Sequence, residues 1–243
     1  MSSKVLVLGD GLLASEIISQ TNWNQISRRK DGFDITDKST YSMMTQIVDG
    51  AGQTCPYDVI LNCIGYTDTY NPKREEHWNV NYKGVSNLVD FCNEWNTKFI
   101  HISTDYVYTH STSNASEEDV PVHAGNWYSY TKLLGDGHVQ LKSKDYLLIR
   151  TTHKPTPFPY PKAWLDQVGN FDYAHNISKL ILRLIEKNSS GLFNVGTEPK
   201  TMYDLAKRTN KDVLPVCEEY DKTRPYNLTM NISKLNKELD SRY

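Results

Sequence analysis

Residues 4–14 read Lys4-Val5-Leu6-Val7-Leu8-Gly9-Asp10-Gly11-Leu12-Leu13-Ala14, and this stretch decides the fold. The apolar run Lys4–Leu8 predicts a strand, and the apolar residues from Leu13 onward predict a helix. The Gly-x-Gly-x-x-Ala turn between them is typical of dinucleotide-binding βαβ units, in which backbone N–H groups at the helix start face a pyrophosphate. We expect Gly9, Gly11, Leu12 and Leu13 to contact the cofactor, and the Asp10 carboxylate to point to solvent. The alternative is a bare strand-to-helix turn.

Short apolar runs alternate with amphipathic helices along the rest of the chain. Two helical stripes repeat at three- and four-residue steps, one from Val85 to Trp95 and one from Ile177 to Ile185. We expect strands at Lys4–Leu8, Asp58–Leu61, Phe99–Ile102, Tyr146–Ile149 and Leu192–Val195, with a weaker candidate at Asn24–Ser27. This order predicts an α/β Rossmann fold with a doubly wound parallel sheet.

The alternation thins out after Thr151, just before a proline-rich run at Lys154–Pro161. We therefore expect a dinucleotide-binding domain at 1–151 and, at 152–243, mainly a small, shortened C-terminal substrate lobe. Residues from about 171 to 196 are expected to return to the Rossmann core.

Composition excludes several classes of protein. The 243 residues carry 27 Lys+Arg against 29 Asp+Glu, a net charge of -2, which argues against a nucleic-acid-binding protein. The sequence contains no apolar stretch long enough for a membrane span and no export signal, so we expect a cytoplasmic protein without membrane partners. The four cysteines are scattered, and we assign no metal ligands.

About 20 residues after the glycine turn, dinucleotide folds carry the residue that selects the ribose. This chain has Ser27-Arg28-Arg29-Lys30 there, three cations and a hydroxyl, which suit a 2′-phosphate. We therefore expect NADPH as cofactor, with NADH still open, and the alternative is a solvated basic patch. Asp34, followed by Ile35, is placed to accept a hydrogen bond from the adenine amino group.

Tyr128 and Lys132 are four residues apart, so on a helix both side chains lie on one face. A neighbouring ammonium stabilises a phenolate, and we expect the pKa of Tyr128 to fall from about 10 toward neutrality, which would make Tyr128 a general acid. Ser103 and Thr104 end a predicted strand, where a hydroxyl can bind the same substrate oxygen. Another strand ends in a small-residue turn suited to run beside a cofactor, Cys63-Ile64-Gly65.

With these features the chain resembles the extended short-chain dehydrogenase/reductases, and within them the dTDP-4-dehydrorhamnose reductases. The resemblance covers nearly the whole chain. It is carried by the glycine turn, Asp34, Asn62 with Thr67, Val80-Asn81, His101 to Tyr108, Glu118-Asp119, Tyr128 with Lys132, Ile149-Arg150-Thr151, Gly191 to Asn194, and Arg224 to Leu228 with Lys234.

The resemblance implies reduction of the C4 ketone of a nucleotide-linked 4-keto-6-deoxysugar. Thr104, Tyr128 and Lys132 would be catalytic, with Lys132 also holding the ribose of the nicotinamide half. The other cofactor-binding residues would be Ile35, Thr67 and Ser103, together with Tyr128 and Lys132. Asp105 and Tyr106 would contact the sugar, and Arg224 the diphosphate. A homodimer is common among relatives, although this sequence has no diagnostic surface.

Two positions separate this chain from its relatives. Tyr106 stands where the related dehydratases carry a glutamate, so elimination lacks its base. His153 stands where the rhamnose reductases usually carry a tryptophan that packs on the sugar, so His153 either stacks there or lies on the surface. We expect His77 on the surface and Trp78 in the core. Two other functions stay open, a silent NADP-binding regulatory subunit and an epimerase that retains NAD.

Overall fold

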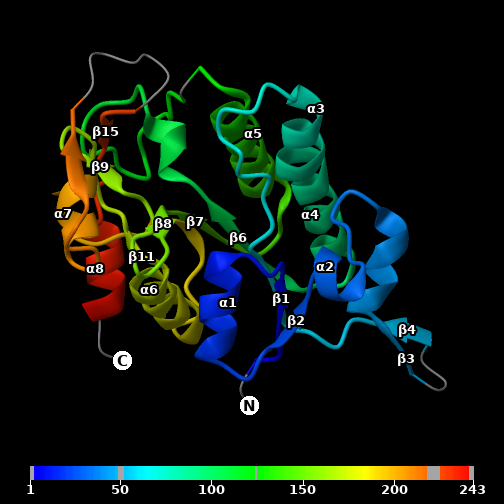
Figure 1. Cartoon of the computed structure of the whole chain (residues 1–243). Helices are drawn as coiled ribbons and strands as arrows, with labels where there is room; N and C mark the ends of the chain where they lie inside the picture. The colour runs from blue at the N-terminus through cyan, green and yellow to red at the C-terminus, as the bar shows by residue number, and fades with distance from the viewer. Residues whose placement is uncertain (1–2, 49–51, 124, 218–224, 241–243) are drawn as a thin grey trace.

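The computed structural model describes residues 3–48, 52–123, 125–217 and 225–240. Its centre is a six-stranded parallel sheet in the order β12-β7-β6-β5-β1-β2 (Figure 1). The strands are β1 (Val5–Leu8), β2 (Asn24–Ile26), β5 (Val59–Asn62), β6 (Lys98–Ser103), β7 (Tyr146–Arg150) and β12 (Gly191–Asn194). All six expected strands are present, with ends within one residue of the predicted ones, and the predicted Rossmann fold is confirmed.

Helices cover both faces of this sheet, as Figure 1 shows. Successive side chains of β1 point to opposite faces, so Val5 and Val7 join one core and Leu6 and Leu8 the other. The first core is completed by α1 (Leu12–Ser19), α6 (Ala174–Glu186) and α8 (Ser233–Asp240), and the second by α4 (Val85–Glu94) and α5 (Trp127–Lys142). A strand buried on both faces explains why β1 reads as a continuous apolar run.

Short elements connect the layers of the core. They are α2 (Arg28–Asp31), η1 (Lys38–Met44), α3 (Arg74–His77), η2 (Trp78–Gly84) and η3 (Asp105–Tyr108), with an antiparallel pair β3 (Gln46–Val48) and β4 (Gly52–Thr54). The pair β3–β4 lies outside the main sheet. The winding therefore passes from β2 to β5 on the other side of β1, which makes the β1–β5 boundary the point where the strand order reverses.

A second, smaller core belongs to the C-terminal lobe. It gathers eight buried side chains, Phe158, Ala163, Phe171, Tyr173, Met202, Leu205, Ala206 and Val213. Its elements are α7 (Met202–Lys207) with β8 (His153–Lys154), β9 (Lys162–Trp164), β10 (Val168–Gly169), β11 (Asp172–Tyr173), β13 (Lys200–Thr201), β14 (Leu214–Val216) and β15 (Asn227–Leu228). In Figure 1, α7, β9 and β15 lie together at the left of the sheet.

Helix α6 packs on the main sheet and strand β12 pairs within it. Helix α8 does the same, because Leu235 and Leu239 are buried against the first core. Residues after 151 therefore contribute to both the main core and the smaller core.

The contact between α5 and η2, a π-helix, leaves no room for a side chain at Gly135. A Cβ there would lie 2.6 Å from the backbone oxygen of Asn81. The Asn81 side chain bonds the backbone of Tyr66 and the Thr131 hydroxyl. Asn81 therefore ties the loop after β5 to the helix that carries Tyr128.

We predict that Gly135→Ala destabilises the protein by about 1–3 kcal/mol, because α5 must move away from η2. Gly137→Ala on the same helix is the matched control, since a Cβ there meets nothing within 4 Å. It should raise stability by about 0.5–1 kcal/mol. Urea unfolding of both variants measures the two effects, and equal effects would contradict this packing.

Candidate active site

The glycine turn lies where the strand order reverses. Gly9 has a φ of +100°, in the region that favours glycine, and a Cβ there would lie 3.1 Å from Cγ1 of Ile64. Gly11, which precedes α1, has no side chain to bond the free N–H groups of the first helical turn. Those N–H groups can therefore bind an anion.

A cavity of about 410 Å³ opens at this carboxyl edge of the sheet. It brings together most of the predicted site, namely Gly11, Leu12, Leu13, Cys63, Ile64, Gly65, Thr67, Ser103, Thr104, Tyr106, Tyr128, Lys132 and His153. Six other lining residues were not among the predicted site residues, and these are Ala14, Thr69, Ile102, Thr151, Thr152 and Lys154. Gly9 is outside this lining, in the turn between β1 and α1.

A larger hollow of about 970 Å³ lies at the opposite edge, beside Lys4, Trp23 and Tyr57. Ligands of open parallel sheets bind beyond the carboxyl ends of the strands, so we place the site in the smaller cavity. Within the described parts of the chain, every helix is too short or too polar to cross a membrane.

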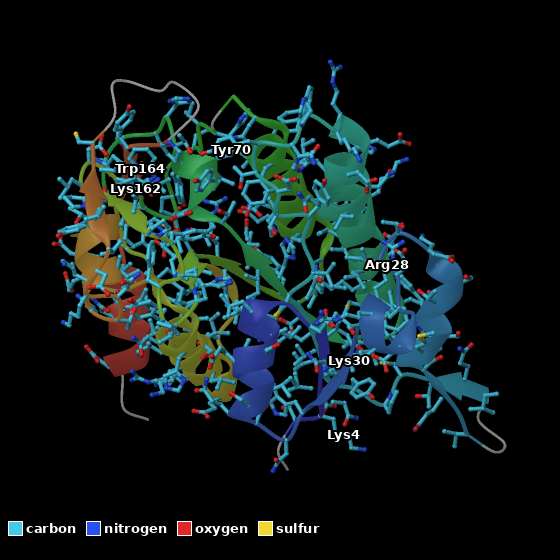
Figure 2. All side chains as sticks on the ribbon, in the orientation of Figure 1. Lys4, Arg28, Lys30, Tyr70, Lys162 and Trp164 are labelled. Atoms are coloured by element: carbon cyan, nitrogen blue, oxygen red, sulfur yellow. The ribbon has the colours of Figure 1, made fainter. Side chains whose placement is uncertain are left out.

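The expected ribose- and adenine-binding residues lie outside this cavity. Figure 2 shows Arg28 and Lys30 on α2, next to β2 at the edge of the sheet. The Ser27 hydroxyl accepts from the Lys30 N–H, and the side chain of Arg28 forms an ion pair with Asp34 at 3.3 Å. Ile35 is buried.

The charged residues predicted near the cofactor pyrophosphate and the substrate diphosphate are Asp10 and Arg224. Asp10 does not point freely to solvent, because its carboxylate pairs with Arg29 at 2.8 Å. The side chains of Arg28 and Arg29 are about four-fifths exposed, so both can still turn toward an anion. Arg224, expected at the diphosphate, lies outside the described residues.

Helix α5 positions Tyr128 and Lys132 one turn apart. The Asn126 side chain caps its start by accepting from the Ser129 N–H at 2.8 Å. The Lys132 ammonium donates to the backbone oxygen of Ile102 at 2.7 Å. Burial lowers the pKa of Lys132 to about 8, although the Asp136 carboxylate opposes that shift.

The expectation that Lys132 lowers the pKa of Tyr128 is wrong. Burial raises the pKa of Tyr128 to about 12, and the carboxylates of Asp105 and Asp136 raise it further, while a hydrogen bond with Thr104 opposes them. The Lys132 ammonium is bound to a backbone oxygen instead. Tyr128 therefore keeps its proton at neutral pH. A general acid requires this protonated state, whereas a general base requires the deprotonated one.

Thr104 links Tyr128 to a buried carboxylate. Its hydroxyl accepts from the Tyr106 N–H and donates to Oδ1 of Asp105 at 3.3 Å. The Thr152 hydroxyl donates to the same oxygen. Asp105 is only 1% exposed, and burial raises its pKa to about 6. Asp105 therefore lies behind the cavity wall and holds the two threonine hydroxyls that form it.

Aromatic side chains pack around Tyr128. The rings of Tyr106 and His77 meet it edge-on, with centroids 5.9 Å and 6.4 Å away. His77 is fully buried and Trp78 is 37% exposed, the reverse of our expectation for this pair. His153 lines the cavity instead of lying on the surface, and burial lowers its pKa to about 4, so its ring is neutral at pH 7.

The sequence analysis also gave no role to His101 or Asn62, which lie behind Lys132. His101 Nε2 is 3.3 Å from the Lys132 ammonium, and its Nδ1 is 3.1 Å from the Asn62 side-chain amide. The sequence feature that could have indicated a role is the polar His101 within the apolar run of β6, because buried polar groups require hydrogen-bond partners.

Comparison with known proteins agrees with this architecture. The family model described as RmlD substrate binding domain matches residues 3–153. The spore coat polysaccharide biosynthesis protein SpsK of Bacillus subtilis (strain 168) is 24% identical over 214 residues, which are 79% of this chain and 73% of SpsK. A dTDP-4-dehydrorhamnose reductase of Mycolicibacterium smegmatis is 26% identical over 163 residues, 62% of this chain and 46% of that protein.

Among solved structures, the dTDP-4-dehydrorhamnose reductase of Bacillus anthracis str. Ames, in complex with NADP, has a TM-score of 0.80 and 21% identity. The alignment covers 98% of this chain and 93% of that one. At this identity the likeness establishes the shared fold.

We predict that Asp105→Asn stabilises the protein more at pH 7.5 than at pH 4.5. Because the pKa of Asp105 is about 6 when folded and 3.8 in its reference state, ionisation costs stability as the pH rises through this interval. The cost is at most about 3 kcal/mol at pH 7.5 and is small near pH 4. Urea unfolding at both pH values measures it, and a pH-independent effect would contradict a raised pKa.

Proposed function

We propose that this chain, which belongs to the RmlD substrate binding domain family, is an NADPH-dependent reductase of a nucleotide-linked sugar. The proposed reaction reduces the C4 ketone of a 4-keto-6-deoxysugar. The observation that carries the proposal is the shared cavity, where Thr104, Tyr128 and Lys132 lie beside the glycine turn. A silent binding subunit has no need of this combination.

The residues of the cavity fit a nicotinamide dinucleotide. Gly9 and Gly11 leave the backbone open at the start of α1, and the buried hydroxyls of Ser103 and Thr151 have no hydrogen-bond partner in the described structure. When bound, such a cofactor supplies a hydride. Gly11 and Leu12 would hold its pyrophosphate, and Cys63, Ile64, Gly65 and Thr67 would line its path across the sheet.

The protein's own contribution is to orient the ketone and deliver a proton. The Thr104 hydroxyl, held by Asp105 and the Tyr106 N–H, would fix the ketone oxygen near Tyr128. Tyr128, whose burial keeps it protonated, would then donate its proton to the developing alkoxide. The Lys132 ammonium is already fixed by the Ile102 oxygen and needs no rearrangement to assist.

Two observations favour NADPH over NADH. The exposed Arg28 and Arg29 side chains follow Ser27, where a 2′-phosphate is expected, and residue 27 is a serine rather than the acid that binds a 2′-hydroxyl. The Bacillus anthracis reductase with this fold was solved with NADP. An epimerase that retains NAD would not need these two arginines, because NAD has no 2′-phosphate for them to bind.

We predict that Tyr128→Phe lowers kcat about 10²–10⁴-fold, because the ketone oxygen loses its proton donor. The assay follows NADPH oxidation at 340 nm with dTDP-4-keto-rhamnose as substrate. Tyr130→Phe is the matched control, since Tyr130 is on the same helix and 39% exposed. NADPH binding should stay within about twofold in both variants. Equal turnover in the two would reject Tyr128 as the acid.

We further predict that replacing both Arg28 and Arg29 with alanine raises the KM for NADPH about tenfold or more and leaves the KM for NADH nearly unchanged. Lys38→Ala, which removes another exposed cation, should change neither value. A parallel rise for both cofactors would mean that the arginines do not read the 2′-phosphate.

A further inference from the structure

Lys154 lines the cavity and lies on β8. This strand directly follows β7 and pairs in parallel with β11, where Lys154 is opposite Tyr173. The cavity lining includes Lys154 together with Tyr106 and Tyr128. The side chain is half-buried, so its ammonium has lost part of its hydration.

The ammonium of Lys154 differs from those of the other enclosed lysines. Lys98, Lys132 and Lys200 each donate to a backbone carbonyl oxygen and thereby replace the lost water. The ammonium of Lys154 makes no hydrogen bond and no ion pair with any residue that the structure describes. Because a partly desolvated cation without an acceptor is costly, a lysine in this position is best explained by an acceptor that arrives with a ligand.

Two titratable neighbours, Asp105 and His153, bear on the charge of Lys154. Asp105 is the carboxylate that acts on it, raising its pKa while burial lowers it. Oδ1 of Asp105 is already bonded to the Thr104 and Thr152 hydroxyls. His153 is neutral at pH 7, because burial lowers its pKa. The attraction between Asp105 and Lys154 therefore acts through space and leaves the ammonium hydrogens free.

Resting on the proposed function, we propose that Lys154 binds an oxyanion of the nucleotide-sugar substrate. A lysine ammonium is a compact point charge with three donors, which suits a phosphate or a carboxylate. The oxyanion has two chemical sources in such substrates, the diphosphate that joins nucleotide to sugar and a carboxylate carried by the sugar ring. With the diphosphate as source, Lys154 holds the substrate behind its ketone. With the carboxylate as source, it selects an acidic sugar, and the sugar is then not the 6-deoxysugar of the proposed reaction.

The test compares Lys154→Met with Lys162→Met in calorimetric titrations of the NADP⁺-saturated protein at pH 7. Lys162 is an exposed lysine on β9 of the same lobe, labelled in Figure 2, and is the matched control. The probes are dTDP, UDP-glucose and UDP-glucuronate, the last two differing only in a carboxylate. Losing a charged hydrogen bond should weaken binding about tenfold or more in Lys154→Met, with no change in Lys162→Met.

Each outcome decides the proposal. Weaker binding of all three probes identifies the diphosphate, and weaker binding of UDP-glucuronate alone identifies the carboxylate. Equal affinities of wild type and Lys154→Met for the three probes overturn the proposal and leave the proposed function standing. A loss of affinity confined to NADP⁺ has the same meaning. If wild type binds NADP⁺ but none of the probes, the nucleotide-sugar function itself fails. Thermal melting of each variant checks that it is folded.

Discussion

The contact between the turn after β1 and the turn after β5 is the constraint on which the rest of the site depends. Gly9 donates its N–H to the Ile26 oxygen at 2.9 Å, and the Cys63 N–H donates to the Leu8 oxygen at 3.0 Å. Three strands are thereby fixed at their carboxyl ends, with Gly9 against Ile64. The chain that follows β1 and the chain that follows β5 then run to opposite faces of the sheet, and the cavity opens between them. A side chain at Gly9 would have to be accommodated both by the backbone and by Ile64.

Burial then sets the protonation states around this cavity. Tyr128 is kept neutral and its pKa rises, whereas the pKa of Lys132 falls, and both shifts have the same cause, the loss of water around a charged form. Asp105, with a pKa of about 6, is the one of the three that changes charge just below neutrality. The protein itself arranges these groups, because Asp105 holds the Thr104 hydroxyl and the Ile102 oxygen holds the Lys132 ammonium.

Local patterns were sufficient to predict the sheet. Each strand is a short apolar run, and the glycine turn and the Tyr128–Lys132 spacing depend on neighbours in sequence alone. What failed depends on distant parts of the chain. The pKa of Tyr128 follows from its burial by Tyr106 and His77, which no spacing reveals. The ion pair of Asp10 with Arg29 joins the first turn to α2 and was missed for the same reason. The packing of α8 on the first core, and the open ammonium of Lys154, likewise require the folded chain.

A crystal structure of the protein with NADPH would show whether one cavity at the carboxyl edge of the sheet holds both the cofactor and Tyr128, the proposed proton donor. We expect the pyrophosphate at Gly11 and Leu12, the 2′-phosphate near Arg28 and Arg29, and the nicotinamide beside Tyr128. Density for the dinucleotide outside this cavity, or a nicotinamide turned away from Tyr128, would contradict this expectation.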